Sequence, residues 1–481
     1  MSPSASHALL NQDVAYVIFQ HLAVPDASWY DYDTATCNTK SVDDTTERRG
    51  TLARCARVCR ALLFPAVSVL WRNLDSLETL GVLAQSSTPQ KAEVRDCGLS
   101  RSVMATNLRP VPGTTDLLPL LSPALRSLHI LFRSSRNTRR YEHQTFVGAL
   151  LLQAAERVPN LRYLRLTRAS GIPEAWLLHV DQFACVEVLD ISEPTYDEVT
   201  TRDLLPRLAA MGNLRSLKLR LPAATINGAY DHATRSFGAL QDLHLDCKHA
   251  SLDYAIALLR LVSSPYLASV RLEECECPTD SLSGSLLEFC TVLHAAFGPT
   301  FRTIFLSMTL IGAPVVFEHP LVKHLEPLFH IRELTEFCFR TALASGNVSI
   351  PVSESDLAAM AESWPRLRHL DLNYVPVAER PGLRTLLSFA RHCPSLTSLN
   401  LPCIDARDVE FLSPCPPHLS LTFCSVSDCG WDSLIPDPEG LAQFLKALFP
   451  NLTLFRPQLR IVSEHWVGTV ESLDGRTSIA C

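Results

Sequence analysis

The chain has 481 residues, of which 47% are hydrophobic and 19% are charged, and its formal net charge at pH 7 is -7. This composition excludes a largely disordered chain, because the charged share is below the roughly one quarter found in typical soluble proteins. The length exceeds what one compact hydrophobic core usually serves. We therefore expect a folded protein made either of several domains or of an elongated array of repeats.

The charge and the apolar segments also bear on nucleic acid and membranes. The negative net charge gives no general attraction to phosphates or anionic lipid. The basic run at residues 133–140 has no interleaved aromatic residues, so we interpret it as a solvated loop. The uncharged stretch at residues 303–317 is shorter than the about 20 residues of a membrane-spanning helix. We expect neither a nucleic-acid partner nor a membrane partner.

The beginning of the chain and the cysteines indicate the compartment. Asp13 interrupts the early apolar run, and no lysine or arginine precedes Lys40, so we expect no export signal. The 16 cysteines are spread over a long chain and often occupy apolar positions, as reduced intracellular cysteines do. These features predict a cytoplasmic or nuclear protein.

Residues 1–80 predict a small helical domain. Residues 10–22 carry apolar side chains at helical spacing, and residues 52–71 repeat that pattern until Pro65 breaks it. Between these two segments, residues 26–50 are acidic and lack apolar periodicity, so we expect a long disordered insert. We assign residues 81–116 to a linker or cap.

From residue 117 onward, one strand signature recurs, with apolar residues at the first, fourth and sixth positions. The copies begin at Leu125, Leu161, Val186, Leu214, Leu240, Leu267, Phe301, Leu334, Leu367 and Leu396, with degraded copies near Leu419 and Leu452. Many intervals are close to the about 20–29 residues of a leucine-rich repeat, and the longer intervals imply loop insertions.

Between the strand signatures lie segments with helical apolar spacing, at residues 146–158, 253–262, 285–297 and 383–393. A strand, a turn and a helix cannot bury their apolar face alone, so neighbouring units stack and the strands align in one parallel sheet. The set resembles leucine-rich repeat proteins over residues 117–457, followed by a C-terminal segment at 458–481. This resemblance implies an α/β fold, a curved solenoid with outer helices.

The residues that alternate with the leucines face the other side of the predicted sheet, because successive strand side chains point to opposite faces. On this concave face we expect an exposed ladder of mixed charge, which is either simply solvated or binds a protein target. The ladder consists of Tyr163, Arg165, Asp190, Lys218, His244, Arg271, Phe305, Asp371 and Asn400.

The N-terminal helices resemble the F-box. The residues that match its pattern are Leu10, Asp13, Val14, Ile18, Phe19, Leu22, Val58, Cys59, Arg60, Leu70 and Trp71. Departures from the pattern are Asn11 where proline is usual, Ala15 where leucine is common, Leu62 where tryptophan often follows, and the insert at 26–50.

This resemblance implies the substrate-recognition subunit of a Skp/cullin/F-box type ubiquitin ligase. The matching residues would bind the Skp adaptor, and through it a cullin, while the repeats would hold an unknown protein target. The alternative is a leucine-rich repeat scaffold without a ubiquitin role, in which the N-terminal helices only cap the open end of the solenoid.

An enzyme is the other alternative. The sequence contains no phosphate-binding loop, no nucleophile elbow and no zinc-protease motif. Cys275 and Cys277 lack the paired two-residue spacing of zinc ligands, so we expect them to pack in the core. We expect a non-catalytic protein without metal or cofactor.

Overall fold

The computed structural model describes residues 51, 54, 102–106, 125–131, 151–167, 180–192, 198–221, 237–312, 319–343, 349–376, 380–402, 404–405, 416–427 and 438–458. The chain forms two compact units, Met1–Thr195 and Tyr196–Cys481, called here the first and second unit. The division falls inside the range 117–457 that the sequence predicts as repeats, and each unit is described by itself.

The first unit contains strands that pair in parallel and in chain order. They are β1 (Ser102–Thr106), β2 (Ser127–Leu131), β3 (Tyr163–Thr167) and β4 (Val188–Ser192). Residues 151–157 are helical and precede β3, and the 3-10 helix η2 (Val180–Gln182) precedes β4. Strand β1 lies inside the range 81–116 predicted as linker or cap, so part of that range belongs to the sheet.

The second unit continues the same pattern, with every neighbouring pair of strands parallel. Its sheet contains β5 (Ser216–Arg220), β6 (Asp242–Asp246), β7 (Ser269–Pro278), β8 (Thr303–Ile311), β9 (Glu336–Leu343), β11 (His369–Asn373), β13 (Ser398–Leu401), β14 (Phe423–Ser427) and β15 (Leu454–Gln458). A small parallel pair, β10 (Ser349–Ile350) and β12 (Val375–Pro376), lies beside it.

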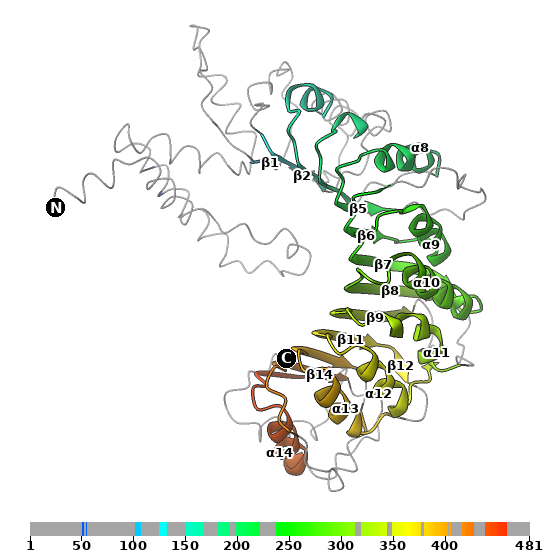
Figure 1. Cartoon of the computed structure of the whole chain (residues 1–481), viewed down its shortest axis with the longest axis vertical. Coiled ribbons are helices and arrows are strands. Elements are labelled where there is room, and N and C mark those ends of the chain that lie inside the picture. Colours follow the sequence, from blue (N-terminus) through cyan, green and yellow to red (C-terminus); the bar gives the residue numbers. More distant parts are fainter. Residues whose placement is uncertain are drawn as a thin grey trace, which may run out of the picture. The chain divides into compact units, whose positions relative to one another are not determined.

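Helices connect successive strands of the second unit and lie on one side of its sheet (Figure 1). They are α8 (Glu198–Ala209), α9 (Leu252–Leu261), α10 (Leu282–Phe297), α11 (Leu321–Leu325), η3 (Glu326–His330), α12 (Glu354–Ser363), α13 (Arg384–His392) and α14 (Pro438–Leu448). The helices predicted at 253–262, 285–297 and 383–393 are confirmed as α9, α10 and α13.

Local signals fix where two of these helices begin. Ser251 Oγ accepts a hydrogen bond from Tyr254 N at the start of α9. Ser353 and Asp356 form a reciprocal capping box at the start of α12, where each side chain bonds to the backbone of the other residue. Both arrangements satisfy backbone N–H groups that a helix start leaves without partners.

The core lies between the sheet and the helices, because the alternating leucines of the strand signature point to that side. In β5 and β6 the buried positions are Leu217, Leu219, Leu243 and Leu245, and they alternate with partly exposed residues. Strand register aligns these leucines from one strand to the next. The fold class predicted from the repeats, an α/β solenoid with a parallel sheet, is therefore confirmed.

The core also holds large aromatic side chains. Trp364, which follows α12, is fully buried. Its ring centroid lies 4.9 Å from that of Phe337 on β9 and 5.6 Å from that of Phe329. Its indole Nε1 donates to Leu328 O at 3.1 Å, so its polar atom is satisfied. The helix layer is thereby tied to the sheet at the level of β9.

A hydrogen-bond pattern at the amino ends of the strands repeats along both units. The carbonyl oxygen of the residue just before one strand accepts from two successive N–H groups at the start of the next strand. Arg302 O, for example, accepts from Thr335 N and Glu336 N, and also from Thr335 Oγ1. Thr397, Thr422 and Thr453 repeat the hydroxyl bond farther along the chain. Each repeat therefore sets the register of the next one.

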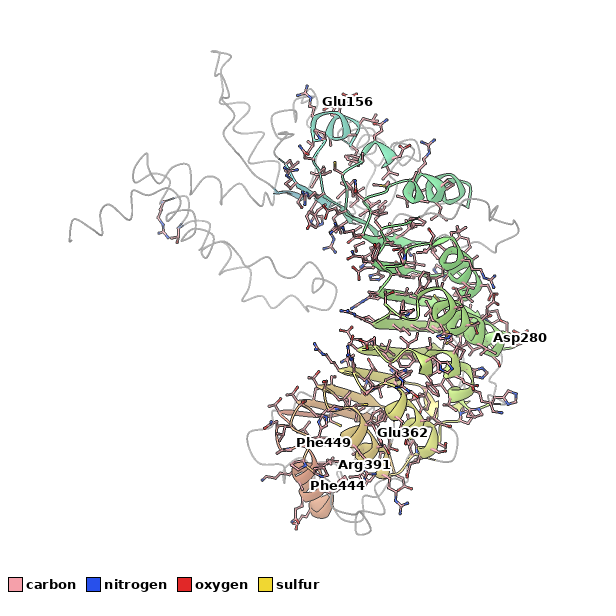
Figure 2. All side chains as sticks on the ribbon, in the orientation of Figure 1. Glu156, Asp280, Glu362, Arg391, Phe444 and Phe449 are labelled. Atoms are coloured by element: carbon pink, nitrogen blue, oxygen red, sulfur yellow. The ribbon has the colours of Figure 1, made fainter. Side chains whose placement is uncertain are left out.

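Cysteines contribute to the core as free thiols. Cys275 and Cys277 on β7 are buried, as expected, and so are Cys247, Cys290, Cys393 and Cys424. Figure 2 shows Asp280 on the outer, helix-bearing side of the second unit, in contrast to these buried groups.

In the part of the chain that the structure describes, no helix combines the length and apolar character needed to cross a bilayer.

Candidate protein-binding face

One row of side chains runs across the strands of each unit on the face away from the leucines, and we call it the central row. In the first unit, strand register aligns His129, Arg165 and Asp190. In the second unit it aligns Lys218, His244, Arg271, Phe305, Cys338, Asp371, Asn400 and Ser425. All predicted ladder residues except Tyr163 thus lie in the central row.

Tyr163 lies two positions before Arg165 on β3, so it is on the same face but in the adjacent row. It is half-exposed, at 39%. The structure adds His129, Cys338 and Ser425 to the row. Sequence reasoning had the signal for them, because each stands at the same position of its repeat as the predicted residues.

Burial differs from the prediction at three positions. Asp190, Asp371 and Asn400 are only 9%, 3% and 8% exposed, whereas the sequence predicts an exposed ladder. The physical reason is that all three bond to side chains of neighbouring strands: Asp371 and Asn400 to each other, and Asp190 to Arg165. Hence only part of the row is available to a partner.

In the first unit, the row is held by a compact ion pair. Arg165 Nε lies 2.8 Å from Asp190 Oδ2, and both side chains are only 12% exposed. Burial, and then the positive charge of Arg165, lower the pKa of His129 from 6.5 to about 4. His129 is therefore neutral at physiological pH, and the Arg165–Asp190 pair is largely shielded from solvent.

In the second unit, the face around the central row from β5 to β8 is more exposed and mixed in charge. His244 Nε2 lies 3.0 Å from Glu273 Oε1, and Arg220 Nε lies 3.7 Å from Asp246 Oδ2. Burial raises the pKa of Asp242, and the positive charge of Arg271 offsets part of that rise. The pattern of both charges on one face suits a protein surface of matching charge.

Arg271 is held only loosely. Its Nη2 lies 3.9 Å from Glu336 Oε2, and both side chains are nearly half-exposed. A partly solvated pair at this distance contributes little to stability. Both groups can therefore turn to a partner at small cost.

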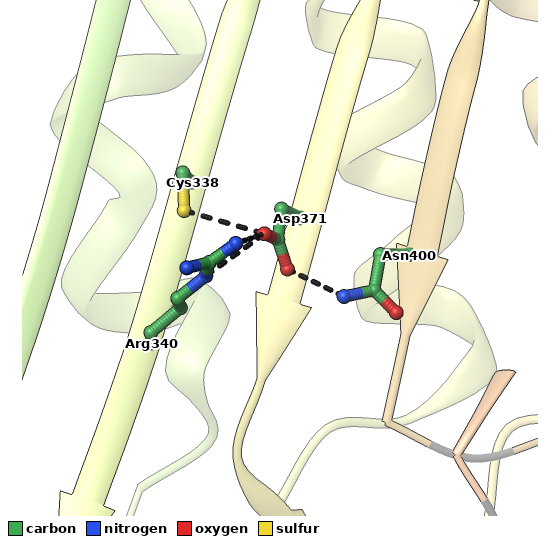
Figure 3. Close-up of polar contacts among 4 residues, drawn as sticks. All are labelled: Cys338, Arg340, Asp371 and Asn400. Carbon is green, nitrogen blue, oxygen red and sulfur yellow. Dashed lines mark hydrogen bonds and ion pairs between the residues drawn. The ribbon is translucent and has the colours of Figure 1, made fainter. Parts of the chain in front are cut away.

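The most organised part of the face is the Arg340 cluster, which consists of Cys338, Arg340, Asp371 and Asn400 (Figure 3). Arg340 Nε and Nη2 both donate to Asp371 Oδ2, at 2.9 and 2.5 Å. Asn400 Nδ2 donates to Asp371 Oδ1 at 2.7 Å, and Cys338 Sγ donates to Oδ2 at 3.6 Å. The buried carboxylate is therefore hydrogen-bonded on both oxygens.

Electrostatics within the cluster follow from this geometry. Burial and the neighbouring Asp371 carboxylate raise the pKa of the Cys338 thiol, so it stays protonated and can donate. Burial opposes the charged form of Arg340, but Cys338 and Asp371 outweigh it and the pKa of Arg340 is raised. Arg340 also lies over the Phe305 ring, 5.5 Å from its centroid.

Sequence reasoning missed Arg340 because it stands two positions after the central row on β9. It aligns with Ser307 on β8 and Asn373 on β11. No repeat-level signal distinguishes it from other polar residues at strand ends. Arg340 reaches Asp371 diagonally, from β9 to the adjacent strand β11, and only the strand register reveals this contact.

Within the described ranges, no group of three or more histidine, cysteine, aspartate or glutamate side chains could hold a metal ion. The groups present on the face form ion pairs, hydrogen bonds and ring contacts. All residues predicted to bind the adaptor, from Leu10 to Trp71, lie outside the described residues.

Comparisons with known proteins add little to this description. Neither a family model nor a curated protein matches the sequence. Among solved structures, a chain of the yeast Rad7 and Elc1 complex matches with a TM-score of 0.45 and 12% identity, over 92% of this chain and 98% of that chain. An internalin from Listeria monocytogenes matches with a TM-score of 0.29 and 12% identity, over 69% of this chain and 82% of that chain. Scores this low carry no information on function, and the repeat fold rests on the chain's own strand register.

Proposed function

We propose that this chain is a substrate-recognition subunit of a Skp/cullin/F-box type ubiquitin ligase. In this proposal the sheet face binds a protein target, and the N-terminal helices bind the Skp adaptor. The observation that carries the target-binding half is the central row, because it gathers charged, polar and aromatic side chains from many repeats on one continuous face.

The energetics of such a face suit recognition of a protein. Half-exposed charges such as Arg271 give specificity and association rate when a partner offers matching charges. Aromatic and arginine side chains are the residues that most often dominate protein interfaces, and Phe305 and Arg340 lie together here. Contacts spread over several repeats then decide which partner binds.

The adaptor-binding half is supported by the ordered F-box matches in the sequence, from Leu10 to Trp71. A receptor of this kind needs no chemistry of its own. Tethering a target and an adaptor in one chain raises the local concentration of the target near the ligase, often to about millimolar. Function then depends on two separate binding surfaces.

A pull-down with purified Skp adaptor tests the adaptor-binding half. Replacing Ile18 and Phe19 together by aspartate should abolish co-purification, since a carboxylate buried without a partner costs several kcal/mol. Gln20→Asp is the matched control, because it adds a carboxylate to the same predicted helix, off the apolar face that the sequence predicts, and should retain binding. Adaptor binding by the double variant would contradict the assignment of Ile18 and Phe19 to the adaptor contact, and no binding by the unmodified chain would contradict the ligase role.

The second candidate function is a repeat scaffold without a ubiquitin role. The same central row favours it equally, because it needs only the sheet face. The two candidates differ in adaptor binding alone, so the pull-down separates them. For the target half, Lys218→Glu with Arg271→Glu is a suitable charge reversal, whereas Asp190 is too deeply buried for one.

A further inference from the structure

We propose that Arg340, held against Phe305 by Asp371, binds a carboxylate side chain on an acidic segment of the protein partner. This inference rests on the proposal that the sheet face binds a protein, and it adds the chemistry that the partner must present. It follows from three properties of the Arg340 cluster: its asymmetric exposure, its free donors and its rigidity.

The ion pair is exposed on one side only. The Arg340 side chain is 48% exposed, whereas that of Asp371 is 4% exposed. A partner that approaches the face therefore contacts the guanidinium and is kept away from the carboxylate. An approaching lysine or arginine would meet a like charge without reaching Asp371, so the cluster favours a negatively charged group.

The guanidinium keeps donors available after it binds Asp371. Nε and Nη2 both bond to the same carboxylate oxygen, Oδ2. These bonds to Asp371 use two of the five N–H donors of the guanidinium, so donors remain on Nη1 and Nη2. Guanidinium groups bind carboxylates through two parallel N–H donors, and such charge-assisted bonds are about twice as strong as neutral ones. The outer edge of Arg340 can form that arrangement.

The side chain is also held in place before any partner arrives. Asp371 fixes the guanidinium from behind, while Asn400 and Cys338 fix Asp371. Phe305 supports one face of the guanidinium. An arginine that is already ordered loses less conformational entropy on binding, so more of the interaction energy appears as affinity.

The surroundings favour a protein carboxylate over a nucleic-acid backbone. Arg271 supplies a second, half-exposed cation in the central row next to Phe305, but Glu336 stands beside it. A run of phosphates would meet that carboxylate, and the whole chain carries a net charge of -7. A single acidic side chain with apolar neighbours fits Arg340 and the Phe305 ring together.

A random library of displayed dodecapeptides, selected on the immobilised full chain, provides the probe. We expect the selected peptides to share an aspartate or glutamate, with basic residues depleted. A synthetic peptide of the best sequence should bind about tenfold more weakly to Arg340→Ala. Arg340→Lys should also bind it more weakly, because lysine keeps the charge but lacks the planar pair of donors.

Two controls separate recognition from misfolding. Arg366→Ala removes an exposed arginine whose Nη1 pairs with Glu333, and it should bind the peptide within about twofold of the unmodified chain. Arg340→Ala combined with Asp371→Asn avoids leaving a buried charge unpaired, and it should bind as weakly as Arg340→Ala. Circular dichroism of each variant should match that of the unmodified chain.

A double-mutant cycle localises the contact. Replacing the shared acidic residue of the peptide by its amide should weaken binding about tenfold to the unmodified chain and leave binding to Arg340→Ala unchanged. Selection of no peptide, selection of peptides without a shared acidic residue, or equal effects of the peptide change on both proteins would overturn the inference. Tighter binding of a 20-nucleotide oligothymidylate than of the peptide, lost in Arg340→Ala, would also overturn it in favour of phosphate. The adaptor pull-down does not involve Arg340, so a failure of the proposed ligase role can be distinguished from a failure of this inference.

Discussion

Both units carry an arginine–aspartate pair on adjacent strands of the sheet face, but the two pairs differ in geometry. In the first unit, Arg165 and Asp190 stand at the same register position and are equally shielded. In the second unit, Arg340 reaches diagonally to Asp371, so the carboxylate is buried and the guanidinium is half-exposed. The same two residue types therefore form a closed contact at Arg165 and Asp190, whereas at Arg340 and Asp371 they leave the guanidinium open to solvent.

The largest effect should come from Asp371→Ala. Removing one partner of a buried charge pair costs about 3–5 kcal/mol, and we expect about 3 kcal/mol here because solvent can reach Arg340. Urea denaturation of the full chain measures the loss in free energy of unfolding. Asp280→Ala, which removes an exposed carboxylate from the outer side, should change the free energy of unfolding by less than about 0.5 kcal/mol. A loss below about 1 kcal/mol in Asp371→Ala would show that the cluster is not tightly coupled.

The next effect concerns acid and the first unit. The folded-state pKa of His129 is about 4, below its ordinary 6.5, because of burial and Arg165. Between these pH values the unfolded state binds a proton that the folded state excludes. The contribution of neutral His129 to the free energy of unfolding is therefore fully present above about pH 6.5 and is lost as the pH falls toward 4. Between pH 7 and pH 4.5, the free energy of unfolding of His129→Gln should fall by about 2 kcal/mol less than that of the unmodified chain. Parallel pH dependences of the two proteins in urea denaturation would contradict this.

A smaller effect should separate the two pairs when each is replaced entirely by apolar residues. Arg165→Met with Asp190→Leu should change the free energy of unfolding by about 1 kcal/mol or less, as apolar replacement of shielded pairs often does. Arg340→Met with Asp371→Leu should cost about 2 kcal/mol, because the buried amide of Asn400 loses its acceptor. Thermal denaturation of both double variants makes the comparison. Equal losses would mean that the two pairs have the same structural role.

The smallest effects are expected at the exposed pairs of each unit. Arg162 pairs with Glu187 in the first unit, and Arg366 pairs with Glu333 in the second. Surface ion pairs contribute about 0–1 kcal/mol. Arg162→Ala and Arg366→Ala should therefore each shift the free energy of unfolding by less than about 1 kcal/mol in chemical denaturation. A larger loss in either variant would show that its arginine also supports the strand edge.

Much of the fold was predictable because consecutive residues within each repeat determine its strand and its helix. The strand signature identified β2 to β9, β11 and β13, since alternating leucines can bury only one face of a strand. Strand β1 was missed because residues 102–106 lack the leucine spacing and are strand by pairing with β2. Helix α8 was missed as well, because Pro206 lies inside it and a proline normally indicates the end of a helix.

The candidate site was predictable in position but not in exposure. The sequence placed Asp371 and Asn400 in one row because they occupy the same position of successive repeats. Their burial depends on Arg340 and Cys338, which come from another strand, and no pattern within a single repeat contains that contact. The difference between the open and the closed ion pair was therefore invisible in the sequence.

By itself, the sequence determined the α/β class, the parallel stacking of repeats and the face on which polar residues gather, because side-chain alternation and helical spacing are properties of consecutive residues. The tertiary structure alone decided which of those polar residues remain available. Exposure and hydrogen bonding on a sheet depend on neighbours about 30 residues away in sequence, and only the register brings Arg340 onto Asp371 and Phe305.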